Sequence, residues 1–181
     1  CVEQLVQLSA SGKAAPAGWM AFAELASGTA DEPQVLVDSD DVATMFFTSG
    51  TESSPKGVLT SHANFYASQL AWALNFGLAQ DDRLLMSLPL IHVAGYLFST
   101  YALANQVTMV MTQVPQPVQM IDLVARHRLS VMVLPPTLYV AMLSCPNFGT
   151  SDLRCAIKLG TWASTIPKSM IDGWKQAAPS S

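Results

Sequence analysis

From Asp40 onward, short continuous apolar runs alternate with longer segments of helical pattern, and this alternation constrains the fold more than any other feature. The apolar runs predict strands over residues 42–47, 58–60, 83–88, 107–112, 131–134 and 154–159. The periodic segments, the first of them capped by Ser61, predict helices over 62–76, 95–103, 118–128, 137–144 and 167–177. Continuous apolar strands that alternate with helices are typical of a parallel sheet covered on both sides. We therefore expect an α/β fold with an open, mainly parallel sheet and helices on both faces.

The chain divides into an uninformative start and a regular remainder. Residues 1–39 carry only weak, short patterns and are predicted to form a poorly defined lead-in segment. Residues 40–181 carry the alternation and are predicted to form the central α/β layer, including a loop suited to phosphate. A chain of 181 residues can bury one sizeable core, which agrees with one domain and a leading fringe.

The low charge of the chain raises the question of a membrane. Half of the residues are hydrophobic and 12% are charged, against about 25% charged in a typical soluble domain. A transmembrane helix needs about 18 or more consecutive apolar residues. The two most apolar stretches, 96–111 and 129–143, are interrupted by Asn105-Gln106 and Pro135-Pro136. We therefore expect no membrane span.

Charge and cysteine content narrow the setting further. The net charge of −4 and the lack of a basic run argue against nucleic acid as a partner. The three cysteines are an odd number and lack the paired short spacing of a zinc site, which favours a reducing, cytoplasmic location.

The segment Thr48–Gly57, with the sequence TSGTESSPKG, carries the chemistry of the chain. It holds five hydroxyl side chains, two glycines and one lysine directly after an apolar strand. Glycines let backbone N–H groups turn toward a ligand, and hydroxyls and a lysine add donors and positive charge, so the loop suits a phosphate chain. The Walker pattern does not fit, because Pro55 stands where its second glycine should be. By composition alone, a polar surface loop is an equal alternative.

The order of residues in this loop resembles the TSGTTGxPKG signature of the adenylate-forming (AMP-binding) superfamily. That superfamily comprises acyl-CoA synthetases, firefly-type luciferases and the adenylation domains of nonribosomal peptide synthetases. The resemblance extends to Gly57–Asn64 (GVLTSHAN) and to Pro89–Gly95 (PLIHVAG), which is similar to PLFHVAG in acyl-CoA synthetases. Val131–Thr137 looks like the family's strand and helix that wall the acyl pocket. The similarity covers about residues 40–178 and implies a fragment of the N-terminal domain of an enzyme closest to acyl-CoA synthetases.

The resemblance implies a role for each matched position. The loop would hold the β- and γ-phosphates of ATP while a substrate carboxylate attacks the α-phosphorus. Its implied ATP-binding residues are Thr48, Ser49, Gly50, Thr51, Glu52, Ser53, Ser54, Lys56 and Gly57, with Thr51 also near Mg²⁺ through Mg-ATP. The implied acyl-pocket residues are His92, which gates or orients the substrate, and Gly160, Trp162, Ala163 and Ser164. No catalytic residue is assigned within this chain.

Three positions depart from the family's pattern. Glu52 stands where the family has Thr or Ser, and its carboxylate would repel bound phosphates unless Mg²⁺ or Lys56 offsets the charge. Ser53 stands where the family has Gly, so a left-handed backbone there would cost about 1 kcal/mol. Trp162 stands in the segment that is Gly-Gly-Ala in the family. It either shortens and reshapes the acyl pocket or packs into the core.

These features predict a fragment of an ATP-dependent carboxylate:CoA ligase. Such an enzyme activates a fatty or other aliphatic acid as an acyl-adenylate with ATP and Mg²⁺ and then transfers the acyl group to CoA. The family's later signatures for adenine, ribose and the C-terminal lysine have no counterpart here, so the chain alone is expected to be inactive. Its partners are expected to be the carboxylic acid, ATP and CoA. Apolar faces that missing segments normally cover would make the isolated chain self-associate.

Two alternatives to a CoA ligase are open. The first is an adenylation domain with a different acceptor. The second is a noncatalytic homologue that uses the fold as a binding scaffold, and the changes at Glu52 and Ser53 motivate it.

Overall fold

The computed structural model describes residues 6–7, 14–28, 34–50, 54–162 and 164–180. By its internal contacts the chain divides into two compact units, residues 1–37 and 38–181. In the first unit, β1 (Val6–Gln7) pairs in parallel with β2 (Met20–Ala21), and α1 (Phe22–Ala26) follows directly. The candidate site lies within the second unit.

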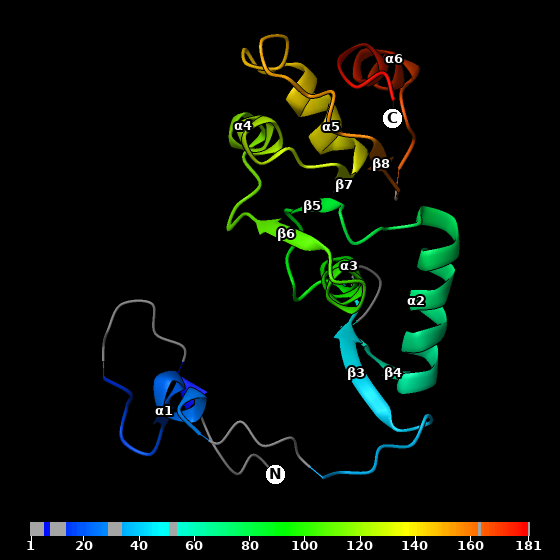
Figure 1. Ribbon diagram of the computed structural model, residues 1–181. Helices are drawn as coiled ribbons and strands as arrows, with labels where there is room; N and C mark the ends of the chain where they lie inside the picture. The colour runs from blue at the N-terminus through cyan, green and yellow to red at the C-terminus, as the bar shows by residue number, and fades with distance from the viewer. Residues whose placement is uncertain (1–5, 8–13, 29–33, 51–53, 163, 181) are drawn as a thin grey trace. The chain divides into compact units, whose positions relative to one another are not determined.

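In the second unit, strands and helices follow one another as the sequence predicts (Figure 1). Their bounds are β3 (Val42–Phe47), β4 (Gly57–Ser61), α2 (His62–Phe76), β5 (Arg83–Met86), α3 (Val93–Ala104), β6 (Thr108–Met111), α4 (Pro117–His127), β7 (Val131–Val133), α5 (Pro136–Leu143), β8 (Lys158–Gly160) and α6 (Lys168–Ala177). Each predicted helix and strand is present, with ends that differ by a few residues. The expected α/β fold is confirmed.

Strands β5 to β8 form one parallel sheet in the order β6-β5-β7-β8. Alternate residues of β5 face opposite sides of this sheet. Leu84 and Met86 join a core cluster with α2 and α3, whereas Leu85 joins a second cluster with α4, α5 and α6. Figure 1 shows these two groups of helices on either side of the strands. Burial on both faces explains why the strands read as continuous apolar runs.

The last strand is shorter than the sequence predicts. Residues 154–159 were expected to be extended, but β8 spans only Lys158–Gly160. Just before it, the Ala156 N–H donates to the Leu153 carbonyl (3.0 Å) in a turn. Both side chains are buried in the cluster beneath α4, α5 and α6. The apolar character of this run therefore reflects a buried turn, which a short hydrophobic pattern does not distinguish from a strand.

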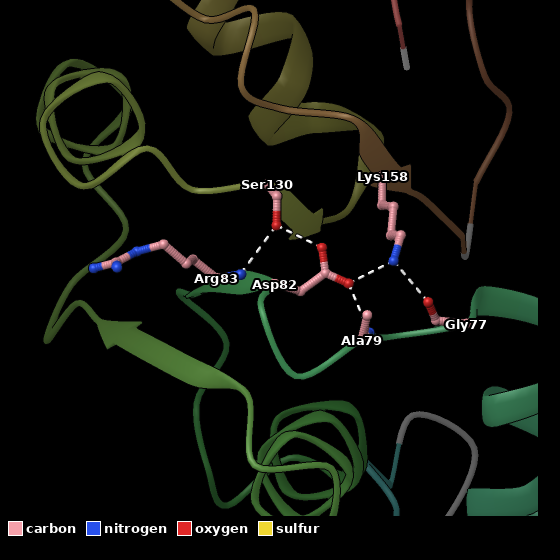
Figure 2. A network of polar contacts seen from close by, with 6 residues as sticks. All are labelled: Gly77, Ala79, Asp82, Arg83, Ser130 and Lys158. Carbon is pink, nitrogen blue, oxygen red and sulfur yellow. Dashed lines mark hydrogen bonds and ion pairs between the residues drawn. The ribbon is translucent and has the colours of Figure 1, made fainter.

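A polar network ties together the amino-terminal edge of the parallel sheet (Figure 2). The Asp82 carboxylate, just before β5, forms an ion pair with Lys158 of β8 and accepts hydrogen bonds from the Ala79 N–H (2.8 Å) and the Ser130 hydroxyl (2.7 Å). Lys158 also donates to the carbonyl of Gly77, just beyond α2 (2.6 Å). Burial acts to raise the pKa of Asp82, but the hydrogen bonds and the Lys158 charge outweigh burial. They hold the pKa below its ordinary value of 3.8.

Helix α2 begins with a capping box. The Ser61 hydroxyl accepts from the Asn64 N–H (3.2 Å), and the Asn64 side chain accepts from the Ser61 N–H (3.4 Å). We expect Ser61→Ala to lower the free energy of unfolding by about 1 kcal/mol, measured by chemical denaturation. Ser68→Ala is the matched control, because the Ser68 hydroxyl donates to a carbonyl within the helix and alanine is the better helix former. An equal loss of stability at both positions would contradict the capping role.

Several large apolar side chains of the second unit are exposed. They lie on the β3–β4 hairpin and along α2: Met45, Phe47, Leu59, Tyr66, Leu70 and Leu74. The three on α2 recur every fourth residue and therefore share one helix face. This surface agrees with the expected self-association of the isolated chain, which stays a prediction. Within the part of the chain that the structure describes, no helix has the length and apolar character needed to cross a membrane.

Candidate functional site

An open hollow of about 680 Å³ lies between the β3–β4 hairpin and the segment that connects β5 with α3. It is lined by Phe46, Phe47, Thr48, Ser49, Val58, Thr60, Pro89, Ile91, His92 and Val93. The start of the predicted phosphate loop and the predicted gating histidine, which are distant in the sequence, thus border the same space. Most of the lining is apolar, with hydroxyls and one imidazole among it, as is typical of small-molecule sites.

The β3–β4 hairpin forms one wall of the hollow. Its strands are antiparallel, with Met45 opposite Leu59, and they form a two-stranded sheet of their own. The sequence predicted both strands but not this pairing. Phe46 and Val58 also lie opposite one another, and both line the hollow.

The predicted phosphate loop, Thr48–Gly57, connects the two strands of this hairpin. At its base, the Thr48 N–H donates to the Lys56 carbonyl (3.0 Å), and the Lys56 N–H donates to the Thr48 hydroxyl (3.0 Å). Gly50 has a φ of 69°, in the left-handed region that favours glycine. The loop therefore has a closed base and a backbone that can turn N–H groups toward an anion.

The tip of this loop is only partly described. Thr51, Glu52 and Ser53 lie outside the described residues, so the magnesium contact expected at Thr51 and the effects expected at Glu52 and Ser53 stay predictions. Ser54 and Lys56 are exposed, where a nucleotide could reach them. Among the described residues, no group of three or more His, Cys, Asp or Glu side chains is arranged to hold a metal ion.

His92 forms the N-cap of α3 on the opposite wall. Its side-chain Nδ1 accepts a hydrogen bond from the Ala94 backbone N–H (3.1 Å), and the backbone N–H of His92 donates to the Pro89 carbonyl (3.0 Å). A ring nitrogen that accepts is deprotonated, so the neutral imidazole carries its proton on Nε2. Because His92 also lines the hollow, it can offer this N–H to an oxygen atom of a ligand.

Gly95, in the first turn of α3, lets the helix lie close to the backbone of the segment that precedes it. A Cβ atom at this position would lie 2.1 Å from the Pro89 carbonyl oxygen. No side chain fits such an approach, so the backbone here requires the glycine that ends PLIHVAG. This close contact fixes the part of the chain that carries His92.

The other predicted acyl-pocket residues are not among the described residues that line this hollow. Gly160 ends β8, and Trp162 packs against Phe98 of α3 with ring centroids 5.8 Å apart. Ser164 is exposed, and Ala163 lies outside the described residues. The packing of Trp162 agrees with the core alternative. The role of these four residues as an acyl-pocket wall stays a prediction.

A second cavity, of about 240 Å³, lies on the other face of the sheet, and no motif in the sequence indicated it. It is lined by Tyr139, Leu159, Thr161, Ile166, Met170, Ile171, Trp174 and Lys175. The Tyr139 hydroxyl shares its one hydrogen between the carbonyls of Met132 (2.9 Å) and Gly160 (3.1 Å), and burial raises its pKa well above the ordinary range. This hydroxyl therefore helps to hold α5 against β7 and β8. The residues that line the cavity come mainly from α5, β8 and α6, which come together only in the folded chain.

Comparison with known protein families shows to which family the chain belongs. The family described as "AMP-binding enzyme" matches residues 2–180. The chain belongs to the AMP-binding enzyme family. The expectation that rested on the phosphate loop and the PLIHVAG segment is thereby confirmed.

Curated relatives of this member of the AMP-binding enzyme family include CoA ligases. A 2-succinylbenzoate–CoA ligase of Bacillus velezensis is 32% identical over 136 residues, which cover 75% of this chain and 28% of that protein. The long-chain-fatty-acid–CoA ligase FadD13 of Mycobacterium tuberculosis is 28% identical over 147 residues, which cover 81% of this chain and 29% of that protein. The chain thus spans less than a third of the length of these relatives.

Solved structures show the same relationship. The inhibitor-bound N-terminal domain of FACL13 from Mycobacterium tuberculosis superposes with a TM-score of 0.81 at 26% identity, covering 87% of this chain and 41% of that chain. O-succinylbenzoate coenzyme A synthetase (MenE) from Bacillus subtilis, in complex with ATP and magnesium ion, superposes with a TM-score of 0.71 at 25% identity, covering 88% of this chain and 33% of that chain. The fold is that of the N-terminal domains of adenylate-forming enzymes.

Proposed function

We propose that this chain is part of an ATP-dependent carboxylate:CoA ligase and that its Thr48–Gly57 loop binds the phosphates of ATP. One observation carries the proposal: the hollow brings Thr48 and Ser49 of this loop together with His92. A phosphate-binding edge beside an apolar, donor-bearing wall suits an ATP phosphate chain next to an organic acid. The names of the curated relatives support the same class of reaction.

The reaction would proceed in two steps. A carboxylate oxygen of the acid would attack the α-phosphorus of ATP. The bond from this phosphorus to the oxygen that bridges to the β-phosphate would break, and pyrophosphate would leave. The thiol of CoA then attacks the acyl carbon, loses its proton, and displaces AMP. In the first step, hydroxyls and backbone N–H groups of the loop and the Lys56 ammonium would stabilise phosphate charge, and a bound Mg²⁺ would supply further positive charge.

The residues present fit a nucleotide phosphate chain. The loop base is closed by two backbone donors, Gly50 adopts the left-handed conformation, and Lys56 is exposed. The acid is proposed to be a fatty or other aliphatic acid, as expected from the sequence. We also propose that the isolated 181 residues do not complete the reaction.

A second candidate is a noncatalytic homologue that binds ligands without turnover. Glu52 favours it, because a carboxylate in the phosphate loop opposes nucleotide binding. Acid-dependent exchange of labelled pyrophosphate into ATP by the full-length protein separates the two. Exchange with at least one acid of an aliphatic panel supports the ligase. No exchange with any acid, together with no ATP binding by calorimetry, would leave the noncatalytic homologue as the remaining hypothesis. A CoA-dependent release of AMP would then distinguish a CoA ligase from an enzyme with another acceptor.

The lysine of the loop gives a direct test of phosphate binding. We expect Lys56→Ala to raise the KM for ATP about tenfold or more, because a charge-assisted contact to phosphate is lost. Lys168→Ala is the matched control, since Lys168 is 89% exposed and pairs with Asp172 on the surface of α6. Equal KM values for both variants in the exchange assay would refute the assignment of Lys56.

Two substitutions separate the capping and ligand-binding roles of His92. Asparagine is a good N-cap but lacks a donor at the position of Nε2, so His92→Asn should keep stability and lower kcat/KM for the acid about tenfold. His92→Gln can place an amide N–H near the position of Nε2 but loses the cap, so it should lose about 1 kcal/mol of stability and retain more activity. If both variants lose activity and stability in parallel, His92 is a capping residue alone. Exchange kinetics and chemical denaturation provide the two measurements.

A further inference from the structure

The two walls of the hollow are attached to different sheets. One wall is the β3–β4 hairpin, and the other is the segment that leaves the parallel sheet at β5 and enters α3. In the described part of the chain, no strand pairing joins these two sheets. The separation of the walls therefore depends on side chains packed between them.

Tyr96 of α3 makes such contacts with both β3 and α2. Its ring packs edge-on against Phe46 of β3, with centroids 5.4 Å apart and planes at 62°. It also packs against Phe65 of α2, with centroids 5.4 Å apart and planes at 53°. Aromatic pairs at these distances prefer tilted and edge-to-face geometries. The ring of Tyr96 thus joins α3 to the hairpin and to the helix that follows it.

The backbone of Tyr96 is tied to the other wall. Its N–H donates to the carbonyl of His92 (3.0 Å), one turn earlier in the chain. On the hairpin side, its ring partner Phe46 itself lines the hollow and precedes Thr48 by two residues. A short path, His92 to Tyr96 to Phe46 to Thr48, therefore crosses from one wall of the hollow to the other.

We propose that Tyr96 is a positioning residue that sets the separation between His92 and the phosphate loop. The inference rests on the proposed function, because the groups it spaces are those assigned to the acid and to ATP. Displacement of a bound reactant by about 1 Å can lower a rate about 100-fold. Loss of the ring should therefore act on turnover more than on the affinity for either substrate.

Helices α2 and α3 also have connections that do not involve Tyr96. The side-chain amide of Gln69 on α2 donates to the Thr100 hydroxyl on α3 (3.2 Å). This bond, together with the packing of Trp72 against Phe98 (centroids 4.6 Å apart), holds α2 on α3 independently of Tyr96. Substitution of Tyr96 should thus leave the fold intact and loosen the hairpin locally.

The test uses the full-length protein with Tyr96→Phe, Tyr96→Leu and Tyr66→Leu. Tyr66 is the matched control, because it lies on the outer surface of α2 and is 66% exposed. In acid-dependent pyrophosphate exchange, Tyr96→Phe keeps the ring and should stay within about twofold of wild type, whereas Tyr96→Leu should lower kcat at least tenfold with KM values within about threefold. Tyr66→Leu should behave as wild type. A kcat for Tyr96→Leu equal to that of Tyr66→Leu would overturn the proposal. A rise in KM with no change in kcat would overturn it as well.

Hydrogen exchange gives a readout that does not need activity. Tyr96→Leu should speed amide exchange in β3 and β4 at least tenfold and leave β5 and β7 unchanged, because only the joint to the hairpin is weakened. Unchanged exchange in the hairpin would overturn the proposal even for an active enzyme. If the wild type supports no pyrophosphate exchange, the proposed function fails, and the hairpin amides alone decide whether Tyr96 holds the two walls.

Discussion

Gly95→Ala should lower the free energy of unfolding by about 3 kcal/mol or more. The added Cβ would lie 2.1 Å from the carbonyl oxygen of Pro89 and 2.7 Å from its carbonyl carbon. These are backbone atoms, so no side-chain rotation relieves the clash and the turn must open. The backbone N–H of His92 donates to the same carbonyl, so His92 should shift when that carbonyl moves. We expect exchange activity of the full-length protein to fall together with stability, measured by chemical denaturation.

Gly173→Ala is the matched control for this substitution. Both glycines lie in helices, where alanine is favoured over glycine by about 1 kcal/mol. A Cβ at Gly173 would approach a terminal methyl group of Leu143 at 2.7 Å, but that side chain can turn away. We expect a net change within about 1 kcal/mol. A Gly95→Ala variant as stable as the Gly173→Ala variant would show that the turn at Pro89 tolerates a side chain.

Asp82→Asn should lower the free energy of unfolding by about 2–3 kcal/mol, since it removes one partner of a largely buried ion pair. The Asp82 side chain is 6% exposed and that of Lys158 is 26% exposed, so the ammonium would be left without its counter-charge in a poorly solvated place. Adding Lys158→Met should recover at least about 1 kcal/mol of that loss, because the unpaired charge is then absent. If the double variant is less stable than Asp82→Asn, the pair is not the source of the loss.

The same network predicts a pH dependence. Because the pKa of Asp82 is lower in the folded protein than its ordinary value of 3.8, the ionised form stabilises the fold above that value. This stabilisation should disappear as the pH falls through the lower, folded-state pKa. Asp82→Asn should flatten the stability profile in that acidic range. Asp152→Asn, which breaks a surface pair with Arg154, is the control and should change stability little.

The position of the candidate site was only partly predictable from the sequence. The TSGTESSPKG and PLIHVAG segments predict Thr48, Ser49 and His92 as site residues, and the structure places all three on one hollow. The sequence leaves two alternatives for Trp162, and its contact with Phe98 depends on the segment after β8 lying against α3. Tyr96 carried no signal, because an aromatic residue in an apolar helix gives no information on which element it will touch.

By itself, the sequence determined the order of strands and helices, the two-sided burial of the parallel sheet and the family to which the Thr48–Gly57 loop belongs. These depend on periodicity and on short-range order, which a linear pattern contains. The tertiary structure alone decided that the hairpin forms a separate antiparallel sheet, that His92 lines the same hollow as the start of the predicted phosphate loop, and that Asp82 meets Lys158. Each of these is a contact between distant segments, and Asp82 and Lys158 are 76 residues apart. Such contacts follow from how the elements pack to bury their apolar faces, and no local pattern specifies them.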